Sequence, residues 1–143
     1  MTAKVETNVG QNVMVAEFTW SVGDTMTNTS GAADAFATVA SHVFDVIKLP
    51  VGAVVIGGDL ITNVAATGST AYNVSVGDSG SATRYLGATD KTTAARTALV
   101  PTGREGTGES IRITVAPTVA EATAGTFTLR VMFVIDGRAN EVL

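Results

Sequence analysis

Apolar and polar residues alternate along much of this chain with the period of two that is typical of β-strands. In residues 13–20, one face of the predicted strand carries Met14, Ala16, Phe18 and Trp20. Residues 126–135 repeat the pattern, and their predicted core face carries Phe127, Leu129, Val131, Phe133 and Ile135. Both segments are therefore predicted strands, each with one face in the core.

The end of the last predicted strand differs from its beginning. Thr126, Thr128 and Arg130 alternate with the core residues, whereas further along Met132 and Val134 make both faces apolar. A strand that is apolar on both sides is typically covered on both sides. We therefore expect residues 126–130 to be half-buried and a second layer to cover Met132 and Val134.

Further strand-like segments lie at residues 4–9, 42–49, 54–63, 71–77, 97–100 and 111–116. Short stretches rich in Gly, Pro and Asp separate them, as expected for turns. About eight strands are too many for one open flat sheet. The sequence therefore predicts an all-β fold, a jelly-roll-like antiparallel β-sandwich of about eight strands.

Three segments modify this picture. Residues 28–40 and 88–97 are rich in small residues, and each is expected to hold a helical turn, the first capped by Ser30 or Asp34. Gly57 and Gly58 interrupt a strand pattern, which predicts a β-bulge or a close backbone approach. We find no internal repeat or linker, so residues 1–143 are expected to form one domain, with residues 1–12 as an N-terminal arm or an edge strand.

The amino-acid composition restricts the classes of protein to which this chain can belong. Hydrophobic residues make up 45% of the chain, charged residues 15%, and the mean hydropathy is +0.32, so the chain is expected to fold and to have partners that cover part of its surface. A net charge of −4 with scattered basic residues argues against nucleic acid as a partner. We expect no membrane span and no signal peptide. The chain has no cysteine, which excludes disulfides and thiolate chemistry.

The string Gly77-Asp78-Ser79-Gly80 resembles the nucleophile loop of chymotrypsin-like serine proteases, and the single histidine, His42, precedes it. That chemistry needs two closed barrels and a buried acid behind the histidine, and this chain is too short for two barrels. Asp78-Ser79-Gly80 also resembles the motif of a dimeric aspartic protease, but Gly77 stands where an apolar residue is expected. A turn between strands is the favoured interpretation.

Other candidate sites are weaker. Residues 103–108 are rich in glycine but lack the lysine and the following helix of a phosphate-binding loop, so they predict a flexible loop between strands. The isolated carboxylates Asp24, Asp59, Asp78 and Asp90 show no metal-ligand spacing. We therefore expect no catalytic residue, no cofactor and no metal site.

Three aromatic residues are candidates for a platform that stacks a sugar. Trp20 and Tyr72 lie in phase with apolar neighbours, which favours core packing, whereas Tyr85 lies in a loop-like context. A carbohydrate-binding β-sandwich module therefore stays an alternative hypothesis.

Two segments between residues 44 and 86 carry a resemblance. Leu49-Pro50-Val51-Gly52-Ala53 leads into an apolar strand, and Val76-Gly77-Asp78-Ser79 is followed after four residues by Arg84-Tyr85-Leu86. This pattern resembles small structural proteins of tailed bacteriophages, in particular jelly-roll cement or decoration proteins that clamp a capsid shell.

The resemblance implies a structural virion protein without enzymatic activity. It implies binding to the major capsid protein on the outer surface of the capsid after synthesis in the host cytoplasm, and self-association as a homodimer or homotrimer. The alternative within the virion is a head-fibre base or a tail component.

Overall fold

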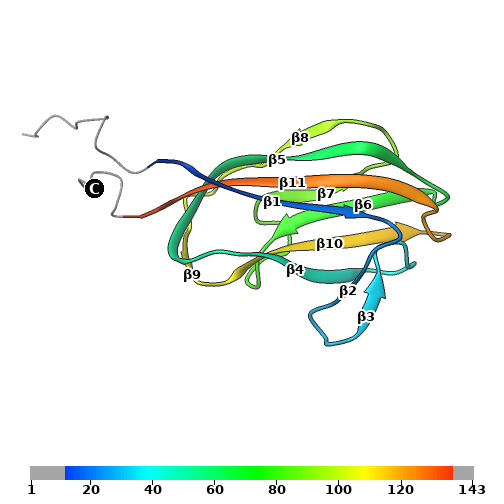
Figure 1. Ribbon diagram of the computed structural model, residues 1–143, viewed down its shortest axis with the longest axis horizontal. Helices are drawn as coiled ribbons and strands as arrows, with labels where there is room; N and C mark the ends of the chain where they lie inside the picture. The colour runs from blue at the N-terminus through cyan, green and yellow to red at the C-terminus, as the bar shows by residue number, and fades with distance from the viewer. Residues whose placement is uncertain (1–11, 137–143) are drawn as a thin grey trace, which may run out of the picture.

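The computed structural model describes residues 12–136, which contain eleven β-strands and no helix (Figure 1). The strands are β1 (Met14–Ser21), β2 (Thr25–Thr27), β3 (Ala33–Ala35), β4 (His42–Lys48), β5 (Val51–Thr67), β6 (Ala71–Gly77), β7 (Leu86–Asp90), β8 (Arg96–Ala98), β9 (Glu105–Thr107), β10 (Ser110–Thr118) and β11 (Ala124–Ile135).

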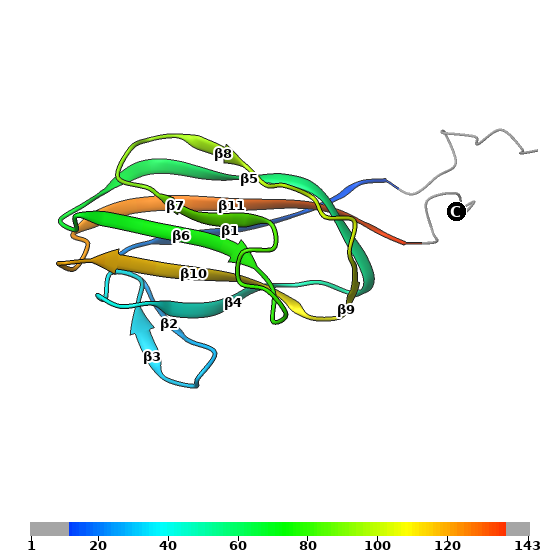
Figure 2. The same ribbon diagram turned by 180° about the vertical axis from the view of Figure 1, so that it is seen from behind.

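Nine of these strands form two antiparallel sheets. The first has the order β1-β11-β5-β8, with β9 also paired to β5, and the second has the order β4-β10-β6-β7. The chain passes repeatedly from one sheet to the other, so that neighbours in a sheet are distant in sequence (Figures 1 and 2). This is the strand order of a jelly roll, and it confirms the predicted fold class.

The pairing of β1 with β11 shows why the alternating pattern was informative. Trp20 lies opposite Phe127 and Phe18 opposite Leu129, in a register without interruption. The predicted core face of β11 is buried, with Leu129 and Val131 both fully inaccessible. The predicted solvent face is only partly correct, because Thr128 is 7% exposed. Its hydroxyl donates a hydrogen bond to Oδ1 of Asn63 and shares another with the Thr19 hydroxyl.

Aromatic rings fill the core at the end of the sandwich that holds the last residues of β1. Trp20 lies 5.3 Å from Phe127, and Phe127 stacks on Tyr72 at 5.0 Å. The Tyr72 hydroxyl donates to the carbonyl of Phe36 at 3.0 Å, and burial raises the pKa of this phenol. Phe36, which directly follows β3, is thus packed in the core between the two sheets.

The two predicted helical turns are wrong. Residues 28–40 contain β3, which pairs with β2 as a hairpin, and Asn28 satisfies the turn by accepting hydrogen bonds from the Ser30 and Ala32 amides. Residues 88–97 contain the end of β7 and the start of β8. Turns stabilised by side-chain hydrogen bonds, together with β-pairing, override the helix propensity of the small residues in these two segments. The predicted strand at residues 4–9 and most of the predicted arm lie outside the described residues.

The bulge predicted at Gly57 and Gly58 is present. Met132 pairs with Gly57 but Phe133 pairs with Val55, so that β5 contains one extra residue at this point. Gly58 has a φ of +138°, and a Cβ added there would lie 2.2 Å from the Arg130 carbonyl oxygen. Only glycine allows this close approach of β5 to β11.

Candidate functional site

Three loops and the described ends of the chain gather at one end of the sandwich, which we call the Asp78 end. The turn between β4 and β5, the loop between β6 and β7 and the segment around β9 all lie there, together with the start of β1 and the end of β11 (Figures 1 and 2). Both halves of the sequence pattern that resembles phage proteins therefore lie at this end.

Asp78 organises the loop between β6 and β7. It is 3% exposed, and its Oδ1 accepts hydrogen bonds from the Gly80 and Ser81 amides at 2.9 and 3.0 Å. Its Oδ2 accepts from Arg84 at 2.5 Å and from Arg104 at 3.2 Å. Burial opposes ionisation, but the hydrogen bonds from Arg84 and the two amides outweigh it and lower the pKa of Asp78. The carboxylate is therefore ionised and fully engaged in holding the loop.

Gly77 explains why a glycine precedes this aspartate. A Cβ at residue 77 would lie 2.0 Å from the Ser81 carbonyl oxygen and 2.5 Å from the Ala82 carbonyl carbon. The loop folds back over this position, and the Tyr85 amide then donates to the Val76 carbonyl to start the pairing of β6 with β7. The Val-Gly-Asp-Ser and Arg-Tyr-Leu parts of the pattern are thus the two sides of one loop closure.

The glycine-rich segment 103–108, predicted to be a flexible loop, contains a strand. Residues of β9 pair with β5 at Val51 and Val54, and Arg104 forms ion pairs with both Asp78 and Glu109. Hydrogen bonds from the backbone amide of Glu109 itself and from Thr107 lower the pKa of the Glu109 carboxyl to about 2. This segment therefore connects the Asp78 loop to the turn between β4 and β5.

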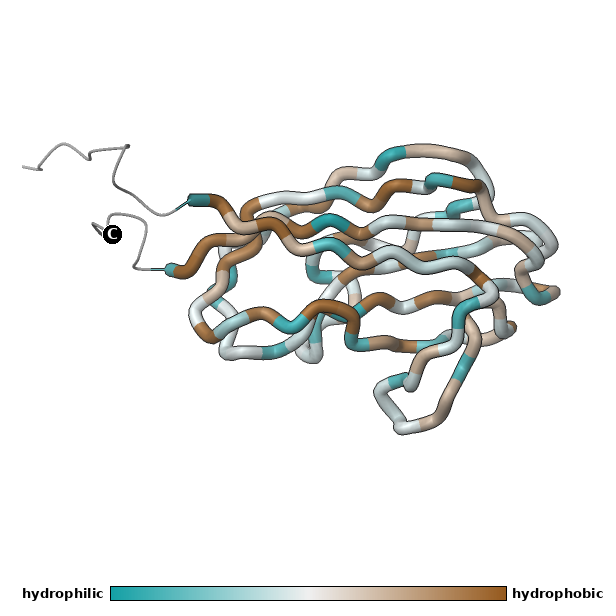
Figure 3. The backbone as a smooth tube through the Cα atoms, in the orientation of Figure 1, coloured by the Kyte–Doolittle hydropathy of each residue, from teal (hydrophilic) through white to brown (hydrophobic). Residues whose placement is uncertain are grey.

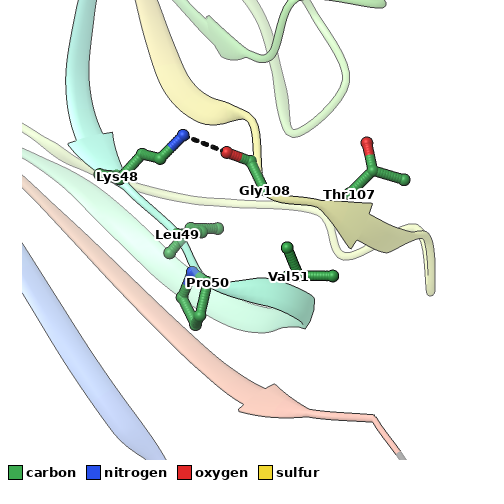
Figure 4. Close-up of a pocket in the computed structure, with 6 residues that line it drawn as sticks. All are labelled: Lys48, Leu49, Pro50, Val51, Thr107 and Gly108. Carbon is green, nitrogen blue, oxygen red and sulfur yellow. Dashed lines mark hydrogen bonds between the residues drawn. The ribbon is translucent and has the colours of Figure 1, made fainter.

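That turn carries the Leu-Pro-Val-Gly half of the pattern and borders a shallow open hollow (Figure 4). Leu49 is buried, Val51 is 73% exposed, and Lys48 donates from Nζ to the Gly108 carbonyl across the hollow. The remaining lining residues are Pro50 and Thr107. The hollow presents an exposed valine and backbone groups, and it contains no acid–base pair.

The serine-protease arrangement is absent because its members lie apart. His42 pairs with Val115 on β10, while Gly77, next to the Asp78 turn, pairs with Arg112 on the other side of β10. Val115 and Arg112 are three residues apart on β10, and this spacing alone places His42 and Gly77 about 10 Å apart along the strand direction. His42 instead contacts Asp34 through Nδ1 at 3.0 Å, a link between β3 and β4.

The dimeric aspartic-protease hypothesis also fails. In such a dyad two carboxyl groups share a proton. Asp78 is bound by two arginines and by two backbone amides, an environment that lowers its pKa and holds it ionised. Asp78 therefore stabilises the turn that the sequence predicts at residues 77–80.

The three aromatic residues considered for sugar stacking are all in the interior. Trp20 is 1% exposed, Tyr72 is fully buried, and Tyr85, expected in a loop, is 5% exposed. None of these rings presents a face to solvent, so they form no platform for a carbohydrate.

The outer face of the β1-β11-β5-β8 sheet is ordered in bands along the strands. Nearest the opposite end are the hydroxyl pairs Ser21–Thr126 and Thr19–Thr128. Next comes a ladder of alternating charge across all four strands, formed by Glu17, Arg130, Asp59 and Arg96. At the Asp78 end the outer face is apolar.

We call this last band the apolar patch; it consists of Val13, Val15, Val54, Met132 and Val134. Val15 pairs with Met132 and Val54 pairs with Val134, and Val13 precedes β1 by one residue. Val13 is 50%, Val15 55% and Met132 36% exposed. Figure 3 shows the apolar stretches of β1, β5 and β11 side by side at this end.

No second layer covers Met132 and Val134 within residues 12–136, contrary to the expectation that both faces of this strand are covered. The sequence pattern indicated these two residues but not Val13, Val15 and Val54. The sequence does contain a signal for these three residues, because the strands next to β11 also place apolar residues at outward-facing positions at the same end.

Among residues 12–136, no group of three or more His, Asp or Glu side chains is arranged to hold a metal ion. The described part of the chain also has no helix that is long and apolar enough to cross a membrane.

Comparisons with known proteins place this jelly roll among phage capsid structures. A chain of the cyanophage Pam1 capsid asymmetric unit is 28% identical, with 93% of this chain and 91% of that chain covered and a TM-score of 0.62. Two others share the fold: a chain of the Ralstonia phage GP4 capsid, at 18% identity, 94% and 90% coverage and TM-score 0.58, and a chain of the acidic stable capsid of Helicobacter pylori bacteriophage KHP30, at 16%, 87% and 89%, and 0.57.

No protein-family model and no curated protein matches this sequence. The chain is thus similar, over nearly its whole length, to structural components of phage capsids.

Proposed function

We propose that this chain is a decoration, or cement, protein of a tailed-phage capsid. It binds the major capsid protein on the outer surface of the shell, self-associates as a dimer or trimer, and carries out no catalysis. The observation that carries the proposal is the likeness to a chain of the Pam1 capsid, at 28% identity over 93% of this chain.

The construction of the Asp78 end supports attachment through that end. The Asp78–Arg84 ion pair closes one loop and the Asp78–Arg104 ion pair joins it to the segment around β9, so a partner meets a preorganised surface and little conformational entropy is lost on binding. Exposed apolar residues gather there, including Val15, Val51 and Met132. An exposed apolar patch with a polar surround is typical of a protein interaction site.

We further propose that residues 1–143 act as one sandwich domain and that residues 1–12 form an arm that contacts the shell. The described chain begins at the Asp78 end, so an arm leaving from there starts beside the proposed attachment surface. A head-fibre base or tail component is the less favoured placement, because the similar structures are capsids.

Co-sedimentation with undecorated capsids tests the proposal. Full-length protein is expected to pellet with the shells and to saturate at a fixed ratio to the major capsid protein. Removal of residues 1–12 should weaken binding to the shells while the unfolding temperature changes little. Protein that stays in the supernatant at every concentration would contradict the proposed function.

A matched pair of variants tests the attachment surface. Val51→Lys changes a residue that is 73% exposed at the Asp78 end, and Val119→Lys changes one that is 84% exposed at the opposite end. We expect Val51→Lys to reduce shell binding and Val119→Lys to leave it unchanged. Equal binding of the two variants would place the contact elsewhere.

A further inference from the structure

The free edge of β1 differs from every other sheet edge in residues 12–136. Natural proteins protect such edges with short strands, bulges, lysines, prolines or a covering loop. β8 has three residues, β7 is interrupted by a register shift against β6, and β4 is bulged and receives a hydrogen bond from Thr29 at Val43. β1 has eight residues and pairs with β11 in a regular register.

The side chains of β1 are equally unprotected. The strand contains no lysine, proline or glycine, and its single charge, Glu17, is paired with Arg130 at 2.7 Å. Its inward-facing residues Met14, Ala16 and Phe18 are only partly buried, whereas Leu129 and Val131 on the neighbouring strand are completely buried. A strand placed beside β1 would complete the burial of this side of the core.

From these observations we infer that β1 pairs with β1 of a second copy, antiparallel across a two-fold axis, to join two sheets into one. A neighbour of this kind satisfies the outward-facing backbone groups of both strands where they overlap, and the closed symmetry stops further growth at this edge. The charge pattern permits the approach, because Arg130 compensates Glu17 in each copy.

The apolar patch selects the register. If the two strands cross at Glu17, the two carboxylates stand directly opposite each other, which is unfavourable. If they cross at Met14, residues 12–16 of the two copies overlap, Val13 of one copy stands opposite Val15 of the other, and the apolar patches of both copies, including Met132, become continuous. The second register brings the two apolar patches together and keeps the two carboxylates apart, so it is the register that we infer.

The oligomeric state of the purified full chain tests this inference without capsids, so its failure is distinguishable from failure of the proposed function. Light scattering should give a dimer. Val15→Lys should raise the dimer dissociation constant by about tenfold or more. Val64→Lys is the matched control, because Val64 is also on this sheet and is 52% exposed, against 55% for Val15.

Cross-linking tests the register itself, since the chain contains no cysteine. Oxidation of a mixture of Val13→Cys and Val15→Cys chains should give more disulfide-linked dimer than oxidation of either variant alone, because the two positions face each other across the axis. A monomeric or trimeric wild-type chain overturns the two-fold pairing. So does a Val15→Lys dimer as tight as the Val64→Lys dimer, or equal cross-linking in all three samples.

Discussion

Arg104 donates a hydrogen bond from Nη1 to Oδ2 of Asp78 at 3.2 Å, although 26 residues separate them along the chain. This contact joins the loop between β6 and β7 to the segment that holds β9, and β9 in turn pairs with Val51 at the start of β5, next to the turn between β4 and β5. The two halves of the phage-like sequence pattern are therefore coupled through a segment that the pattern does not include.

The first prediction concerns the stability that Asp78 provides. Asp78→Asn leaves the partly exposed Arg84 and Arg104 facing a neutral amide at a buried position, and weakening hydrogen bonds to a charged group costs about 2 kcal/mol. Urea denaturation followed by circular dichroism measures the loss. Asp45→Asn is the control, because Asp45 pairs with Arg112 at 2.6 Å but is 46% exposed, and its loss should be below about 1 kcal/mol. Similar losses for both variants would mean that the Asp78 cluster is not buried in solution.

The second prediction concerns acid stability. The folded-state pKa of Glu109 is about 2, below its ordinary value of 4.5, and the pKa of Asp78 is also lowered. A lowered folded-state pKa stabilises the fold above the unfolded-state pKa, and this stabilisation is lost as pH falls through the folded-state value. The unfolding temperature should therefore fall between pH 4.5 and pH 2.

Glu109→Gln should flatten part of that fall, because the variant lacks the titrating carboxylate. Glu121→Gln, at an exposed residue, controls for the loss of one negative charge. The comparison is made by calorimetry at several pH values. A Glu109→Gln profile that runs parallel to the wild-type profile from pH 4.5 to pH 2 would contradict the role given to this carboxylate.

The strands could be predicted from the sequence where burial alternates with a strict period of two. Residues of β1 and β10 do so, and those of β11 do so except at Thr128; in each strand the inward-facing residues are more buried than their neighbours. The hairpin of β2 and β3 and the strands β7 and β9 were missed, because they are short and their side chains are small, polar or exposed. In such segments pairing depends on neighbours that are distant in the chain.

The Asp78 cluster shows the same limit for a site. A turn at residues 77–80 was predictable from local chemistry, since Asp and Gly are favoured in turns. Its partner Arg104 was not, because only the jelly-roll topology brings residues 101–109 beside the end of β6. The exposed state of Met132 was mispredicted for a related reason: an apolar outer face indicates that something covers it, but not whether the cover belongs to the same chain.

The third prediction tests the register of β11. Val131→Asp places a charge at a fully buried position without a partner, and we expect the domain to unfold, because the cost is comparable to the whole stability of a small domain. Thr19→Asp, on the exposed outer side of β1, should cost less than about 1 kcal/mol. Thr128→Asp should fall between them, since Thr128 faces outward but is 7% exposed. Circular dichroism and urea titration rank the three variants, and a different order would show that the register is wrong.

The last prediction concerns the two glycines that flank the Asp78 loop. A methyl group at residue 77 would lie 2.0 Å from the Ser81 carbonyl oxygen, and backbone cannot move aside as a flexible side chain can. Gly77→Ala should therefore open the loop and destabilise the fold by about 2 to 4 kcal/mol. Gly87→Ala is the matched control within β7, where an added Cβ meets nothing within 4 Å and replacing glycine in a strand is neutral or slightly stabilising. Hydrogen exchange would locate the effect: the Gly80 and Ser81 amides, which Asp78 holds in the wild type, should lose protection only in Gly77→Ala. If both variants keep these amides protected, the loop does not pack over residue 77 and the structural explanation of the Val-Gly-Asp-Ser pattern is wrong.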